Sequence, residues 1–201
     1  IEHGLKDLGI HSGMVSDSMV ELIESGVVNN RKKALNPGKV VTTTIVGTRA
    51  LYDYVNRNSL ISGFPCDYTH DLQIIASNNK MISINNALRV DLTGQVCSET
   101  IGIRRVSGTG GQLDYIRGAN MSLGGKGIIC LNASFTRKDG TVSSNIVSTL
   151  ELGDTVSVPA IDVSYVVTEF GIVNLKGQNS GQRAKLLISI AHPDCRAELE
   201  E

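Results

Sequence analysis

Residues 81–96, MISINNALRVDLTGQV, alternate apolar and polar side chains, as a half-buried β-strand does. The alternation breaks at Asn85-Asn86, which predicts two strands or a β-bulge. Outward from this stretch, β-branched runs predict strands, and capping residues followed by helical spacing predict helices. The strands are expected at 39–46, 128–132, 155–158 and 164–168, and the helices begin at Ser16 or Asp17, at Gly47-Thr48 and at Ser180. This order predicts an α/β fold with a mostly parallel or mixed open sheet flanked by helices.

The composition is that of an ordinary globular chain. Its 201 residues are 41% hydrophobic, and 19 basic against 20 acidic side chains give a net charge of −1. This length can bury a sizeable core, and the even composition predicts a single domain over residues 1–201. The balanced charge and the scarcity of aromatic side chains argue against nucleic-acid binding. No apolar run has the length needed to cross a bilayer, so we expect no membrane partner.

Four widely spaced cysteines form no CxxC pair, and the histidines show no ligand spacing. Structural zinc sites usually contain a close cysteine pair, so no metal is expected. A disulfide framework is improbable in a chain of this length and apolar content. The pattern predicts reduced thiols and a cytoplasmic protein. The cysteines are Cys66, Cys97, Cys130 and Cys195.

A glycine-rich stretch, Ser107-Gly108-Thr109-Gly110-Gly111-Gln112, is the first candidate site. Closely spaced glycines can present several backbone N–H groups to an anion or an acyl oxygen. The stretch is neither a Walker A loop nor a Rossmann fingerprint. From spacing alone, a tight loop between sheet elements is an equally good interpretation.

Two strand-associated patterns are weaker candidates. Arg89, Asp91 and Thr93 alternate along one strand and are expected to share a face, which is usually solvent-exposed or an intersubunit contact. Glu169, in Thr168-Glu169-Phe170-Gly171, follows a Val-rich strand, where a carboxylate suits a site or a helix cap equally well.

Six segments follow one another along the chain: GLKDLGIHSGMVSDSMVELIESGVV, NPGKVV, NNALRVDLTGQV, SGTGGQLDYIRGA, YVVTEFGIVNLKG and QRAKLLISIAHPD. Together they resemble the carboxyl-terminal domain of the acetyl-CoA hydrolase/4-hydroxybutyrate CoA-transferase family, from about Gly4 to Leu199. The resemblance implies a CoA-transferase-like fold and a further amino-terminal domain that this chain lacks. The opening Ile1-Glu2-His3-Gly4, with no initiator Met, agrees with a fragment of a longer polypeptide.

The family resemblance also implies a mechanism. Members move CoA between carboxylic acids through a glutamate that attacks the acyl-CoA thioester and becomes a glutamyl-CoA thioester. CoA is a substrate, no cofactor is bound permanently, and members are commonly homo-oligomers. The implied CoA or oxyanion contacts fall on Gly108, Gly110, Gly111 and Gln112 and on Gly171.

The sequence departs from the family at the expected nucleophile. The family segment reads roughly N-x-A-L-E-V-D-L-T-G-Q-V, and Arg89 stands where that glutamate belongs. A guanidinium stays protonated and cannot form an anhydride. Gly13 is a second departure, because relatives commonly carry a glutamate there. Glu99 is the nearest other carboxylate and an improbable substitute.

Three explanations remain open: a paralogue that lost the chemistry, an introduced substitution, or a nucleophile placed wrongly. If Arg89 faces the pocket, its charge could pair with CoA phosphates or with a substrate carboxylate. The leading hypothesis is the carboxyl-terminal half of a CoA-transferase of the 4-hydroxybutyrate/acetate type. The alternatives are a catalytically silent CoA-binding or oligomerisation module, and an acyl-CoA hydrolase.

Overall fold

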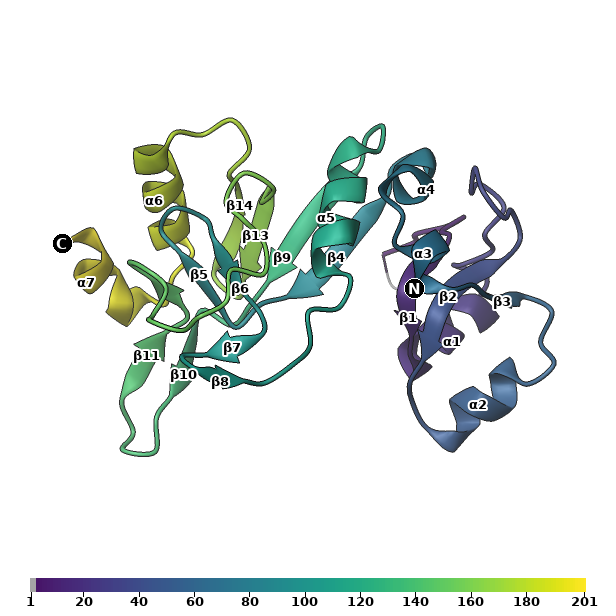
Figure 1. Ribbon diagram of the computed structural model, residues 1–201, viewed down its shortest axis with the longest axis horizontal. Helices are drawn as coiled ribbons and strands as arrows, with labels where there is room; N and C mark the ends of the chain where they lie inside the picture. The colour runs from purple at the N-terminus through teal and green to yellow at the C-terminus, as the bar shows by residue number, and fades with distance from the viewer. Residues whose placement is uncertain (1–2) are drawn as a thin grey trace. The chain divides into compact units, whose positions relative to one another are not determined.

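The computed structural model describes residues 3–201. They divide into two compact units (Figure 1). Unit 1 comprises the residues up to Met81 together with Met121–Gly124, and unit 2 comprises Ile82–Asn120 and Gly125–Glu201. The even composition predicts a single domain over residues 1–201. That the two units act together as one domain stays a prediction.

Unit 1 contains a three-stranded parallel sheet in the order β1-β2-β3. Its core is built on Val15, Val40 and Leu51, which are fully buried. The strands are β1 (His11–Val15), β2 (Val40–Ile45) and β3 (Ile61–Gly63), and the helices are α1 (Asp17–Glu24), α2 (Arg49–Val55), α3 (Cys66–Thr69) and α4 (Leu72–Ser77).

The ends of the first two helices follow the sequence pattern. Ser16 is the N-cap of α1, and Gly26 adopts a left-handed φ of +76° just after that helix ends. Thr48 is the N-cap of α2. Its backbone N–H and its hydroxyl donate to the Asp17 carboxylate at 3.0 and 2.6 Å, which ties the starts of α1 and α2 together.

The main sheet of unit 2 has the order β14-β13-β9-β4. Three of its strands are parallel, and β14 (Gly171–Asn174) returns antiparallel to its neighbour. The parallel strands are β4 (Ile82–Asn86), β9 (Lys126–Cys130) and β13 (Tyr165–Thr168). This mixed sheet confirms the predicted α/β class, and the carboxyl ends of its parallel strands lie at one edge.

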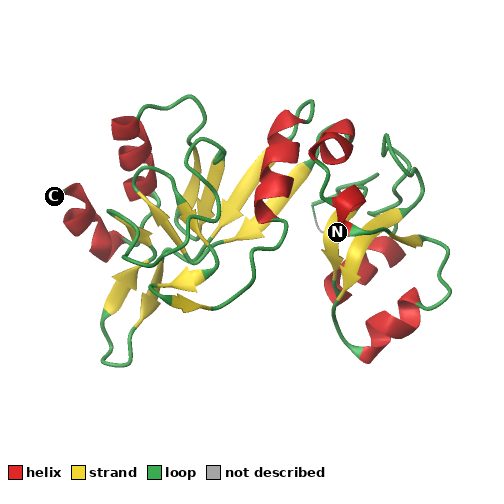
Figure 2. Cartoon of the chain, in the orientation of Figure 1, coloured by secondary structure: helices red, strands yellow, loops and turns green. Residues whose placement is uncertain are grey.

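Smaller elements complete unit 2 (Figure 2). A second sheet pairs β5 with β12 in parallel and with β6 in antiparallel fashion. The predicted division into two strands is confirmed, but the break falls at Ala87-Leu88 rather than at Asn85-Asn86, and the two strands belong to different sheets. These elements are β5 (Arg89–Asp91), β6 (Val96–Cys97), β12 (Ile146–Val147), the hairpin strands β7 (Thr100–Ile101) with β8 (Arg104–Arg105) and β10 (Ser134–Thr136) with β11 (Val142–Ser144), and the helices α5 (Gln112–Met121), α6 (Ser180–Ser189), η1 (Pro193–Cys195) and α7 (Arg196–Glu200).

The two faces of the main sheet differ in burial. On the inner face, Ile129 and Val166 pack in one cluster with Ile116 of α5 and Leu187 of α6. On the outer face, the side chains of Ile84 and Ile172 are 66% and 69% exposed. Parallel sheets are usually covered on both faces, so this exposed apolar surface is unusual.

Two local predictions differ from the structure. Residues 155–158 form no strand: Val158 makes one isolated bridge to Val96, and the Thr155 N–H donates to the Thr100 hydroxyl. The helix expected from Ser180 begins there as α6, but Asn179 caps it through a reciprocal pair of hydrogen bonds with Gln182, and the further helix α7 follows.

Candidate functional site

The carboxyl edge of the main sheet gathers most of the predicted site residues. Gln112, the first residue of α5, donates from Nε2 to the carbonyl of Asn86 at the end of β4, at 3.2 Å. Glu169 and Gly171 follow the end of β13 at the same edge. Open α/β sheets bind ligands at this edge, so unit 2 presents a candidate site there.

The glycine-rich loop, residues 107–111, is exposed and leads into the N-terminus of α5. Gly110 has a φ of +58°, which favours glycine. Within residues 3–201, the backbone N–H groups of Gly108, Thr109, Gly110 and Gly111 have no hydrogen-bond acceptor. Four open donors before a helix N-terminus suit an anion or a developing oxyanion.

Glu99 is hydrogen-bonded to this loop and to the residues that precede it. Its backbone carbonyl accepts from the N–H groups of Val106 and Ser107 at 2.8 and 3.3 Å. Its carboxylate Oε2 accepts from Arg105 Nη1 at 3.1 Å and from the Thr109 hydroxyl at 3.2 Å. Sequence reasoning treated Glu99 as a poor substitute nucleophile and missed these contacts.

Arg89 is enclosed by acidic groups. Its Nη1 lies 2.8 Å from Glu151 Oε1 and 3.2 Å from Asp154 Oδ2, and its side chain is 11% exposed. Burial lowers the pKa of Arg89, but the hydrogen bonds and charges of Glu151 and Asp154 outweigh burial and raise that pKa. The Asp154 side chain is fully buried and also accepts the Gly102 N–H at 2.7 Å. The Arg89 guanidinium is therefore part of a structural ion-pair network.

The segment VDLTGQV forms a turn rather than a chemical site. The Asp91 carboxylate accepts from the N–H and hydroxyl of Thr93 and from the N–H and amide of Gln95, at 2.6–3.0 Å. Asp91 is 2% exposed, so the expected solvent or intersubunit role of this strand face is wrong for Asp91. Gly94 completes the turn with a φ of +93°.

Glu169 and Gly171 also have local structural partners. Glu169 Oε2 accepts the Ala133 N–H at 2.9 Å, which fixes the chain beyond β9. At Gly171 an added Cβ would lie 3.2 Å from Ile190 Cγ2, so close packing accounts for this glycine. A CoA contact at Gly171 stays a prediction.

Gly13, the other departure from the family, lies in β1 of unit 1 and is half-buried. The two positions where a family glutamate was expected therefore belong to different units. Their surroundings can be compared separately: position 89 is lined by carboxylates, whereas position 13 lies in a parallel strand followed by Val15 and the N-cap of α1.

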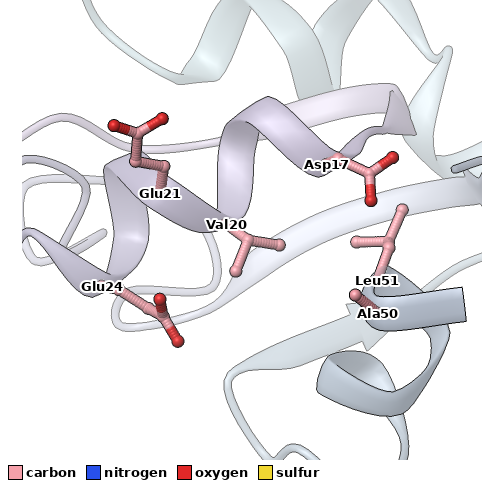
Figure 3. A pocket seen from close by; sticks show the side chains of 6 residues that line it. All are labelled: Asp17, Val20, Glu21, Glu24, Ala50 and Leu51. Carbon is pink, nitrogen blue, oxygen red and sulfur yellow. The ribbon is translucent and has the colours of Figure 1, made fainter. Parts of the chain in front are cut away.

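A cavity of about 310 Å³ lies between α1 and α2 of unit 1 (Figure 3). Three of its lining residues, Asp17, Glu21 and Glu24, are acidic. Such a rim repels the phosphates of CoA, and none of the predicted site residues lines it. A second cavity of about 380 Å³, lined by residues of α6 and α7 and by Leu92, also contains none of them.

Neither a metal-binding cluster nor a membrane-spanning helix is found in residues 3–201. No three His, Cys, Asp or Glu side chains there are grouped so as to hold a metal ion. No helix in that range is long and apolar enough to span a bilayer. The four cysteines are free.

The amino-acid sequence of the chain is similar to those of known proteins. Residues 47–201 match the family model described as acetyl-CoA hydrolase/transferase C-terminal domain. The chain is 49% identical to a 4-hydroxybutyrate coenzyme A transferase of Clostridium kluyveri over 96% of its own length, and 50% identical to a succinyl-CoA:cyclohexane-1-carboxylate CoA transferase of Geobacter metallireducens over 98%. It covers 44% of each of these relatives.

A solved structure agrees. RipA from Yersinia pestis superposes with a TM-score of 0.89 at 44% identity, over 98% of this chain and 44% of that one. The fold of this chain is thus shared with part of a protein about twice as long.

Proposed function

The chain belongs to the acetyl-CoA hydrolase/transferase family, and from that premise we propose that it is the carboxyl-terminal half of a protein built like a CoA-transferase, which binds CoA thioesters. The reaction of active relatives moves CoA between carboxylic acids. Because the relatives are named for different acids, we propose acyl-CoA thioesters and carboxylic acids, 4-hydroxybutyrate and acetate among them, as the substrate class. CoA is a substrate, and cytoplasmic location stays a prediction.

The observation that carries this proposal is the set of open donors at the glycine-rich loop. The N–H groups of Gly108, Thr109, Gly110 and Gly111 point to no acceptor among residues 3–201. A thioester oxygen gains negative charge when its carbonyl is attacked, and preorganised N–H groups stabilise that charge. The loop therefore supplies binding and oxyanion contacts without any reactive side chain.

The carboxylate nucleophile is the second part of the mechanism. A glutamate oxygen attacks the thioester carbonyl, the C–S bond breaks, and CoA leaves as thiolate. The thiolate then attacks the glutamyl carbonyl of the anhydride, which releases the first acid and forms a glutamyl-CoA thioester. A second carboxylate accepts CoA through the same steps in reverse.

We assign the nucleophile of active relatives to position 13 rather than to position 89. A glutamate replacing Arg89 would lie against Glu151 and the buried Asp154, and neighbouring carboxylates disfavour the ionised form that must attack. Among the described ion pairs, none places a carboxylate beside position 13, and relatives commonly carry a glutamate there. The sequence left three explanations open for Arg89. The carboxylates around position 89 favour the third, that the nucleophile was placed at the wrong position.

With glycine at position 13, this chain retains the thioester-holding loop but lacks the attacking group. Glu99 and Glu169, two of the carboxylates near the loop and the sheet edge, each accept hydrogen bonds from backbone or side chains. We therefore propose CoA binding without turnover for this chain, which corresponds to the silent-module alternative within the same family. A hydrolase needs the same nucleophile and is disfavoured equally.

The exposed apolar face of the main sheet suggests a surface that a partner covers. The outer face of unit 2 exposes Ile84 and Ile172, and the relatives carry more than half of their length outside the matched region. We propose that an amino-terminal domain or a second copy of the chain packs there.

The test uses the polypeptide that contains this chain, treated with acetyl-CoA and then with borohydride, which reduces a glutamyl-CoA thioester to a defined mass change. We expect unmodified protein to bind CoA without label, and Gly13→Glu to be labelled on the peptide that carries the substitution. Arg89→Glu is the matched control: tested under conditions where circular dichroism shows it folded, it stays unlabelled. If only Arg89→Glu is labelled, the nucleophile of active relatives belongs at position 89 and not at position 13. Label on Glu99 or Glu169 of the unmodified protein overturns the silent assignment, and absence of CoA binding overturns the proposed function.

A further inference from the structure

Glu99 is a buried carboxylate that the transfer mechanism does not use. Its side chain is 4% exposed, and both donors to its carboxylate, Arg105 and Thr109, converge on the same oxygen, Oε2. A buried charge is unfavourable unless it is paired and hydrogen-bonded, and Arg105 and Thr109 supply the ion pair and the hydrogen bond here.

Within residues 3–201, the hydrogen-bond partners of Glu99 all lie in the segment leading to the open donors. Its carbonyl fixes the N–H groups of Val106 and Ser107, and its carboxylate fixes the side chain of Thr109, which sits between two glycines. Arg105, the cationic partner, also reaches the Ser107 carbonyl at 3.4 Å. One buried residue thus connects the hairpin strand β8, the loop backbone and the loop side chain.

The glycine-rich loop has little else to hold it. Apart from sequence neighbours, no atom of residues 3–201 lies within 4 Å of the place where a Cβ would stand at Gly108 or Gly110. Glycines lose more conformational freedom on ordering than other residues, so such a loop needs an anchor to present a fixed set of donors. The Ser107 hydroxyl contributes a second tie, to the Ser98 carbonyl at 3.2 Å.

We infer that Glu99 is a positioning residue: it holds the loop in the conformation that presents the N–H groups of residues 108–111 to a CoA thioester. The inference rests on the proposed function for the identity of the ligand. Its nearly complete burial and its two donors prevent the Glu99 carboxylate from reaching a thioester carbonyl itself. The role acts through Thr109 and through the backbone that follows it.

The decisive variants separate charge, shape and hydroxyl contact. Glu99→Gln keeps the shape but removes the charge, and Glu99→Asp keeps the charge one methylene shorter. Thr109→Val removes the hydroxyl at similar size, whereas Thr109→Ser restores it. Glu151→Gln is the matched control, because Glu151 is also paired with an arginine, Arg89, outside the loop and its anchor.

Two measurements are made on each form of the polypeptide that contains this chain: hydrogen–deuterium exchange of the peptide covering residues 104–112, and the affinity for CoA by calorimetry. We expect Glu99→Gln to speed exchange in this peptide and to weaken CoA binding about ten-fold, since hydrogen bonds to charged groups are the stronger ones. Thr109→Val weakens binding less, Thr109→Ser binds like the unmodified protein, and Glu151→Gln changes neither readout.

The outcomes distinguish this inference from the proposed function. If Glu99→Gln lowers thermal stability but leaves loop exchange and CoA affinity unchanged, Glu99 is a structural residue and the inference fails. If Glu99→Gln speeds loop exchange while no form binds CoA, the anchor stands and the proposed function falls. Equal weakening by Glu151→Gln also refutes the inference, because the effect is then not specific to the loop.

Discussion

Replacing Arg89 with methionine is expected to destabilise unit 2 by about 3 kcal/mol, because removing one partner of a buried ion pair leaves the other charge uncompensated. The partner left behind is Asp154, whose side chain is fully buried. Two backbone donors, the N–H groups of Gly102 and Glu151, remain on its carboxylate at 2.7 and 3.1 Å. They keep the loss at the lower end of the range of about 3–5 kcal/mol for broken buried pairs.

Urea unfolding followed by far-ultraviolet circular dichroism measures this loss, since the chain has no tryptophan for fluorescence. Arg117→Met is the matched control. Arg117 pairs with Asp162 at 2.9 Å, but its side chain is 42% exposed, so its removal is expected to reduce stability by about 1 kcal/mol or less. Arg89→Lys keeps the charge and should retain most of the stability.

Arg89→Glu tests the same network in the opposite direction. It adds a third carboxylate beside Glu151 and Asp154, so we expect a larger loss than for Arg89→Met. If Arg89→Met is no more harmful than Arg117→Met, or if Arg89→Glu is as stable as the unmodified protein, the network is not structural. The argument that excludes position 89 for the nucleophile then fails with it.

Three further outcomes follow. Gly153→Ala should lower the free energy of unfolding by about 2 kcal/mol or more, because Gly153 has a φ of +93° and an added Cβ would lie 2.8 Å from Ile103 Cγ2; an unchanged urea midpoint contradicts this. Burial lowers the pKa of Lys33 from 10.5 to about 8, so between these values the unfolded chain binds a proton that the folded chain lacks, and stability should rise with pH across that window. Lys33→Gln should abolish the rise, and a rise that persists in this variant assigns it to another group. Ile84→Cys should react with maleimide more slowly than Ile161→Cys, whose native side chain is 88% exposed, if a partner covers the outer sheet face; equal rates mean that the face is bare, and protection lost on dilution means that a second copy covers it.

The elements that depend on local pattern were predictable from the sequence. Gly26 follows the end of α1 because a left-handed φ is a property of a single residue, whereas Ser16 occupies the N-cap without a capping hydrogen bond from its side chain. Residues 155–158 have strand-like composition, but strands need partners, and here Val158 meets Val96 at a single bridge. Composition contains no information about which edge is free, so this prediction was wrong.

The site was predictable in part for the same reason. The close spacing of Gly108, Gly110 and Gly111 predicts a loop with accessible backbone N–H groups. The carboxylates that pair with Arg89 lie more than sixty positions away, as the sequence separation of 65 to Asp154 shows, and no local rule finds them. Glu99 and Thr109 are ten positions apart across a hairpin, so their contact also depends on the tertiary fold.

The Asp91 turn has a consequence for recognising proteins of this kind. Its carboxylate satisfies the donors of Thr93 and Gln95, and Gly94 leaves room for Arg183 Nη1, which would lie 2.9 Å from a Cβ there. These contacts stabilise the VDLTGQV turn whether position 89 carries an arginine or a carboxylate. The segment therefore reports how this part of the chain folds, and a working transferase has to be recognised from its attacking residue instead.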